Sequence, residues 1–131
     1  MSRILLDQNV PVGVRQFLPG HEIRTAHQMG WSDLSNGELL AAMEAAGYDL
    51  LISSDQNLVY QQNLADRRIS VLVLDTNRWA ALRTRSADIE RAVAQANTGS
   101  FTRLRRRHAS VFKFASGRQP DLLPPPRAAF A

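Results

Sequence analysis

Leu50-Leu51-Ile52-Ser53-Ser54-Asp55 decides the fold, because this apolar run of strand length ends in small polar residues and a carboxylate. Two further runs have the same form: Arg3–Leu6 precedes Asp7, and Ile69–Leu74 precedes Asp75. Their length and composition are typical of buried strands. Helical patterns separate the three runs, so the sequence predicts an α/β domain with a parallel sheet and right-handed crossovers.

The remaining elements follow from turn and cap signals. Ser35 or Asn36 is the expected N-cap of a helix that Gly47 ends, and Glu38 stands where a capping box with Ser35 needs it. Ser86 is the expected cap of a later helix. The other expected elements are helices at 11–18, 56–64 and 86–97, strands at 22–25 and 99–104, and a weaker strand at 111–114.

Length and composition indicate one ordinary globular domain. The chain has 131 residues, of which 44% are hydrophobic, and it has no cysteine. Disulfides, thiolate metal sites and cysteine nucleophiles are therefore excluded. The apolar run at the N-terminus is too short for a signal peptide, and no stretch has the length of a membrane span. We expect a cytoplasmic protein that makes no membrane contact.

Charge is distributed unevenly along the chain. Residues 1–98 carry nine arginines against eleven acids, whereas residues 99–131 carry seven basic residues against Asp121 alone, so the net charges are −2 and +6. A basic C-terminal segment suggests a polyanionic partner such as RNA, although charge alone favours a solvated basic tail. Residues 115–131 are rich in proline and arginine, so we expect an extended or disordered tail after a domain at 1–114.

Four carboxylates are expected at one edge of the sheet. Asp7, Asp55 and Asp75 follow strands, and parallel strands end at a common edge where α/β folds place ligands. Glu38 begins a helix at that same edge. Clustered carboxylates repel one another, and a divalent cation relieves the repulsion. Oxygen-only ligands favour Mg²⁺ or Mn²⁺, which can activate water for phosphodiester hydrolysis. Turn formation explains each Asp equally well by itself, and capping explains Glu38.

The sequence also resembles a known family in the order and spacing of its motifs. The matching segments are Ile4-Leu5-Leu6-Asp7-Gln8-Asn9-Val10-Pro11, Phe17-Leu18-Pro19-Gly20-His21-Glu22, Gly30-Trp31, Asn36-Gly37-Glu38-Leu39-Leu40, Ser54-Asp55-Gln56-Asn57-Leu58 and Tyr60-Gln61-Gln62-Asn63-Leu64. They resemble the PIN-like family DUF5615, within the PIN and Mut7-C-like nuclease superfamily. The resemblance covers about residues 3–104.

The resemblance implies a three-layer sandwich around a mostly parallel sheet of four to five strands. It implies an endoribonuclease, often the toxin of a toxin–antitoxin pair, that uses Mg²⁺ or Mn²⁺. Carried over, Asp7 and Asp55 are catalytic metal ligands. Related sequences often have Asp at the position of Asn36, so Glu38 is the expected third ligand, with Asp75 assisting. An antitoxin, such as a DUF433-type protein, and a homodimer are the implied protein partners.

Several polar residues are expected to contact substrate near these acids. Asn9, Asn36 and Asn57 can offer carbonyl oxygens or position phosphate. Arg78 can contact phosphate, whereas the neighbouring Trp79 is better explained by packing. The remaining expected contacts are Gln61, Arg103, Arg105 and Arg107, the three arginines lining one side of a strand.

Two functional hypotheses therefore stand side by side. The first is a metal-dependent endoribonuclease, in which Asp7, Glu38 and Asp55 hold the cation. The second is a catalytically weak or inactive PIN-like module that binds RNA or an antitoxin. The second follows from Asn36 and Asn57, which stand where many relatives carry Asp and so lower the negative charge of the site.

Overall fold

The central sheet has six strands in the order β2-β1-β3-β4-β5-β6, seen in a computed structural model that describes residues 2–58, 67–96, 99–104 and 109–113. The strands are β1 (Arg3–Leu6), β2 (Glu22–Thr25), β3 (Leu50–Ser53), β4 (Ser70–Leu74), β5 (Ser100–Leu104) and β6 (Ala109–Lys113). The first five run parallel, and β6 pairs antiparallel with β5 at one edge. The sheet thus has one strand more than the four to five predicted.

Side chains alternate between two hydrophobic cores on opposite faces of the sheet. On β1, Ile4 and Leu6 face one core and Leu5 the other, and β3 and β4 repeat this alternation. Such strands are buried on both faces, as parallel strands between helical layers must be. The uninterrupted apolar sequences of β1, β3 and β4 follow from this burial.

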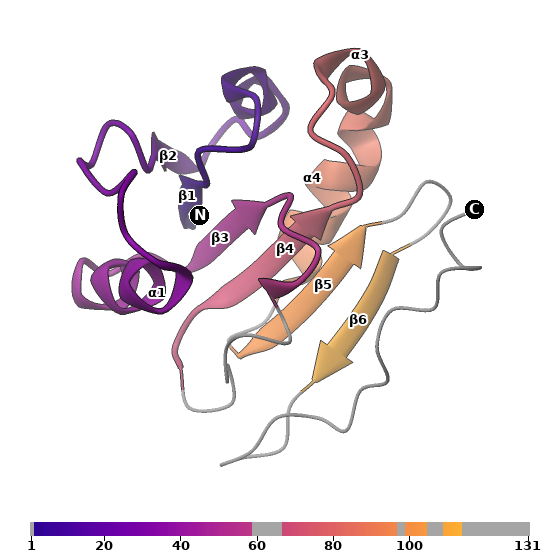
Figure 1. Ribbon diagram of the computed structural model, residues 1–131. Coiled ribbons are helices and arrows are strands. Elements are labelled where there is room, and N and C mark those ends of the chain that lie inside the picture. The colour runs from indigo at the N-terminus through magenta and orange to yellow at the C-terminus, as the bar shows by residue number, and fades with distance from the viewer. Residues whose placement is uncertain (1, 59–66, 97–98, 105–108, 114–131) are drawn as a thin grey trace.

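Helices cover both faces, which makes three layers (Figure 1). The 3-10 helix η1 (Val12–Phe17), α3 (Trp79–Leu82) and α4 (Ser86–Gln95) lie on one face. The helix α1 (Asn36–Ala45) packs Leu39, Leu40 and Met43 against the other. The predicted α/β class and layered arrangement are confirmed, and they are compatible with a PIN-like sandwich.

The predicted helix caps and the predicted segments at 56–64 and 115–131 have different outcomes. Ser35 is the N-cap of α1 with a complete capping box, as predicted. Ser86 was predicted to cap the later helix, and this is wrong: α3 and the 3-10 turn η2 (Arg83–Arg85) precede it, so Ser86 already has helical backbone angles. The short α3 carries no sequence signal of its own. The helix expected at 56–64 lies mostly outside the described residues, as does the tail at 115–131.

Trp79 has a packing role, as the sequence indicates. Its ring stacks on Phe17 with centroids 5.4 Å apart, and it lies over Gly13 so closely that a Cβ there would meet the indole at 2.6 Å. This stacked pair packs α3 against η1 beside the carboxyl ends of the strands.

Within the described residues, no helix has the length and apolar character needed to cross a bilayer.

Candidate functional site

The parallel strands β1, β3 and β4 end at one edge of the sheet (Figure 1), and polar residues follow each of them. Asp7 follows β1, Ser54 and Asp55 follow β3, and Asp75 follows β4. Register places Leu6 beside Ile52, so the loops after β1 and β3 leave the sheet next to each other. The topology therefore brings together segments that lie more than forty residues apart in sequence, as the hydrogen bond between Ser53 and Asp7 confirms.

The hydroxyl of Ser53 links the first two aspartates. Ser53 is fully buried, and its Oγ donates a 2.8 Å hydrogen bond to Oδ2 of Asp7. The same Oγ accepts a 3.1 Å hydrogen bond from the backbone N–H of Asp55. Asp7 is 9% exposed as a residue, and its carboxylate also accepts from the Gln8 N–H through Oδ1. One hydroxyl thus links the Asp7 carboxylate to the backbone of Asp55.

Asn9 makes a second connection between the loops. Its Oδ1 accepts from the Ser54 N–H at 3.1 Å, and its carbonyl accepts from the Ser54 hydroxyl at 3.4 Å. Asn9 was predicted to contact substrate. In this structure its side-chain oxygen holds the loop after β3.

Asn36 brings the first turn of α1 to the site. Its Nδ2 donates to Oδ2 of Asp55 at 3.1 Å, while the Asn57 N–H donates to Oδ1 at 3.0 Å. Asp55 therefore has neutral donors on both carboxylate oxygens. The predicted approach of the α1 start to the site is present, and the side chain that makes it is Asn36.

Glu38 is engaged elsewhere. Its Oε1 accepts from the Ser35 N–H at 2.9 Å, and the Ser35 hydroxyl accepts from the Glu38 N–H, which completes the capping box. These hydrogen bonds, chiefly the one from the Ser35 backbone, lower the pKa of Glu38 below its ordinary value. The capping alternative describes the contacts of Glu38, and no contact joins it to Asp7 or Asp55 among the described residues.

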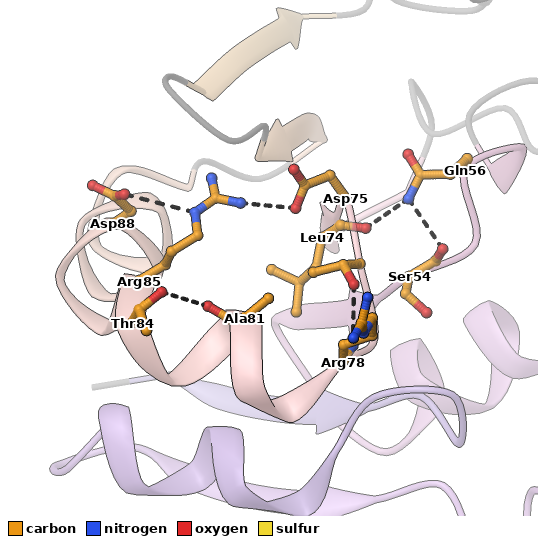
Figure 2. Close-up of polar contacts among 10 residues, drawn as sticks. Ser54, Gln56, Leu74, Asp75, Arg78, Ala81, Thr84, Arg85 and Asp88 are labelled. Carbon is orange, nitrogen blue, oxygen red and sulfur yellow. Dashed lines mark hydrogen bonds and ion pairs between the residues drawn. The ribbon is translucent and has the colours of Figure 1, made fainter. Parts of the chain in front are cut away.

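Asp75 also has a different partner from the one predicted (Figure 2). Its Oδ1 lies 2.8 Å from Nη1 of Arg85, a side chain that is 12% exposed, and Arg85 Nε lies 3.9 Å from Asp88. The Arg85 guanidinium neutralises Asp75, the role predicted from the sequence for a metal cation. The ion pair links the end of β4 to the start of α4.

The amide of Gln56 connects the loop after β3 to β4 (Figure 2). Its Nε2 donates to the carbonyls of Leu74 at 2.6 Å and Ser54 at 3.1 Å. Sequence reasoning missed this residue, because a glutamine in a polar loop has no periodicity or spacing that marks it. Its position directly after Asp55 was the only available signal.

The predicted arginine surface is partly wrong. Arg103 is 2% exposed and β5 is buried along its whole length, so Arg103 does not line an open side of the sheet. Arg78 is exposed after β4. Its backbone N–H donates to the Thr76 hydroxyl, and the guanidinium takes no part in that hydrogen bond. Gln61, Arg105 and Arg107 lie outside the described residues.

The described residues contain no group of three or more His, Asp or Glu side chains arranged to hold a metal ion. Mg²⁺, however, commonly takes one or two protein carboxylates and completes its shell with water and substrate phosphates. Asp7 and Asp55, with the amide oxygen of Asn36 reachable by rotation of that amide, are hard donors of this kind. The donor set therefore fits Mg²⁺ or Mn²⁺ in an open site, and it does not form an all-protein cage.

Comparisons with models of known protein families, with curated proteins and with solved structures find no match to this chain.

Replacing Ser53 with alanine tests the link between the aspartates. In Ser53→Ala, an Asp7 oxygen and the Asp55 N–H lose their partner, so unfolding should become easier by about 1–3 kcal/mol. Ser54→Ala is the matched control, since its hydroxyl makes only a 3.4 Å contact, and it should cost less than about 1 kcal/mol. Urea unfolding measures both values, and equal losses would contradict the assigned role of Ser53.

The capping box predicts a pH dependence. Because the folded-state pKa of Glu38 is lowered, its stabilising contribution is complete above the ordinary value of 4.5 and is lost as the pH falls below it. Glu38→Gln should remove this titration from the pH profile of the melting temperature between pH 6 and 3. A Glu38→Gln profile that parallels the wild type throughout would show that the carboxylate does not cap α1.

Proposed function

We propose that the protein is a metal-dependent endoribonuclease of the PIN-like type that acts in the cytoplasm. The observation that carries this proposal is the pair of strand-end aspartates, Asp7 and Asp55, held together through the Ser53 hydroxyl. Two carboxylates at the carboxyl edge of a parallel sheet lie where α/β folds bind ligands. The motif resemblance noted above supports the same reaction.

The residues of the site have separable roles in this proposal. Asp7 and Asp55 bind Mg²⁺ or Mn²⁺, and Ser53 links the Asp7 carboxylate to the backbone of Asp55. When bound, such a cation lowers the pKa of water and neutralises charge on a phosphodiester. Asn36 contributes to orienting the Asp55 carboxylate through its 3.1 Å hydrogen bond. Glu38 and Asp75 are not metal ligands in this proposal. Glu38 caps α1, which carries Asn36, and Asp75 pairs with Arg85.

RNA is the proposed substrate because the chain offers cations near the acids. The guanidinium of Arg78 is exposed just after β4, at the same edge of the sheet as Asp7 and Asp55. The sequence after residue 98 has a net charge of +6, and such a segment attracts a polyanion. Arg78 and the basic residues of this segment other than the buried Arg103 bind phosphates, while the acids and their cation carry out hydrolysis.

The biological role we propose is the toxin of a toxin–antitoxin pair. The resemblance to DUF5615 supports this role, with a DUF433-type protein as the antitoxin and a homodimer as the assembly. The basic C-terminal segment is the region that would receive an acidic partner.

A second candidate function is a non-catalytic module that binds RNA or an antitoxin. The contact from Asn36 favours it, because a neutral amide stands against Asp55 where a third carboxylate would strengthen a metal site. Glu38 does not compensate while it caps α1. This module would bind its partner in a salt-dependent manner and would take up no Mn²⁺.

Asp7→Asn separates the two candidates. We expect cleavage of single-stranded RNA in Mn²⁺ to fall by about 100-fold, and Mn²⁺ affinity by about 10- to 100-fold, because one of two carboxylate ligands is lost. Glu90→Gln, which removes an exposed carboxylate on α4, is the control and should match the wild type. Equal cleavage by Asp7→Asn and wild type refutes the assignment.

Asn36→Asp should strengthen the metal site. A carboxylate facing Asp55 at about 3 Å repels it, so the metal-free variant should melt at a lower temperature although an acid is otherwise favourable at a helix N-terminus. Mn²⁺ should bind about tenfold more tightly and raise its melting temperature more than that of the wild type. Asn77→Asp changes the charge equally at an exposed position of the same edge. If both variants respond alike to Mn²⁺, the cation does not bind at Asp55.

A further inference from the structure

Arg103 is a buried cation that pairs with no carboxylate among the residues the structure describes. It lies on β5, is 2% exposed, and its Nε is buried with no hydrogen-bond partner. No described carboxylate forms an ion pair with it, unlike Arg85, which pairs with Asp75 and Asp88. The guanidinium is always charged, so burying it without an ion-pair partner lowers the stability of the fold. Arg103 therefore calls for an explanation other than stability.

The contacts of Arg103 point to the loop that carries Asp55. Its Nη2 donates to the carbonyl of Gln56 at 3.0 Å, across 47 residues of sequence. Its guanidinium also lies 5.9 Å from the ring centroid of Phe101, two residues earlier on the same face of β5. The aromatic contact holds the side chain against the sheet, and the hydrogen bond ends at the residue directly after the proposed metal ligand.

Gln56 passes this contact to the neighbouring strand. While its carbonyl accepts from Arg103, its side-chain amide donates to Leu74 at the end of β4 and to Ser54 (Figure 2). The loop after β3 is therefore tied to β4 and β5 on one side. On the other side, Asn9 and Asp7 tie it to β1 through Ser54 and Ser53. Asp55 lies between the hydrogen bonds that join the loop to β4 and β5 and those that join it to the end of β1.

We propose that Arg103 is a positioning residue, which acts through Gln56 to hold Asp55 beside Asp7. The catalytic meaning of this role rests on the proposed function, whereas the ordering of the loop does not. A buried apolar side chain at this strand position would preserve the core equally well. It could not reach the Gln56 carbonyl with a donor, so the loop would be held on the β1 side only.

The proposal separates stability from order in the loop. Arg103→Met removes a buried unpaired charge, so the melting temperature should stay the same or rise. The amides of Ser54 and Asp55 should nevertheless exchange with solvent about tenfold faster, because a hydrogen bond that restrains the loop is gone. A residue that merely stabilises the fold would give the opposite result, a lower melting temperature and unchanged relative protection of these two amides.

Hydrogen exchange measured by NMR on the full-length protein tests this directly. The amides of Leu5 and Ile52, within β1 and β3, report global opening. Their exchange rates should change only as far as the stability of the whole fold changes. Arg103→Lys retains the charge but lacks the planar fork of donors, so it should restore part of the lost protection. Arg91→Met, which removes an arginine that is 65% exposed on α4, is the control for loss of charge.

Mn²⁺ titration of the same variants distinguishes this proposal from the proposed function. If the wild type binds Mn²⁺, Arg103→Met should bind it about tenfold more weakly, and Arg91→Met should bind like the wild type. If the wild type binds no Mn²⁺ while exchange at Ser54 and Asp55 accelerates in Arg103→Met, the positioning role stands and the nuclease proposal fails. Unchanged exchange at both amides in Arg103→Met overturns the positioning role.

Discussion

The candidate site depends on one buried hydroxyl, that of Ser53, which donates to the Asp7 carboxylate and accepts from the Asp55 backbone. Two carboxylates cannot be brought together inside a protein unless neutral donors or a cation offset their charge. Here the offset comes from Ser53, from the Asn36 amide and from backbone N–H groups. These donors offset the charge of the two carboxylates within the protein itself, and the proposed cation would bind in addition to them.

The same constraint explains how the other charged residues of this edge are arranged. Asp75 is neutralised by Arg85, and the Glu38 carboxylate is used by the capping box, so neither adds an unpaired charge to the pair. Arg103 is the exception, since its buried charge has no ion-pair partner among the described residues. Its hydrogen bond to Gln56 places that exception next to Asp55, where order matters most for the proposed chemistry.

Sequence patterns predicted the strands and the edge well, because burial on both faces makes β1, β3 and β4 continuously apolar. The capping box at Ser35 followed from spacing alone. Contacts between distant polar side chains could not be predicted in this way. The hydrogen bonds from Asn36 to Asp55 and from Gln56 to Leu74 depend on three-dimensional placement, and so does the burial of Arg103 on β5. Alternation along a strand indicates which residues share a face, but it does not indicate whether that face is open.

Whether Asp7 and Asp55 bind a cation can be measured by the paramagnetic broadening of backbone amide signals by substoichiometric Mn²⁺, because the broadening falls steeply with distance from the ion. We expect the signals of residues 7–9, 36 and 53–57 to broaden first, while those of α4, which carries Asp88 and Glu90, stay sharp. Broadening centred on α4, or none at millimolar Mn²⁺, would contradict a cation site formed by Asp7 and Asp55.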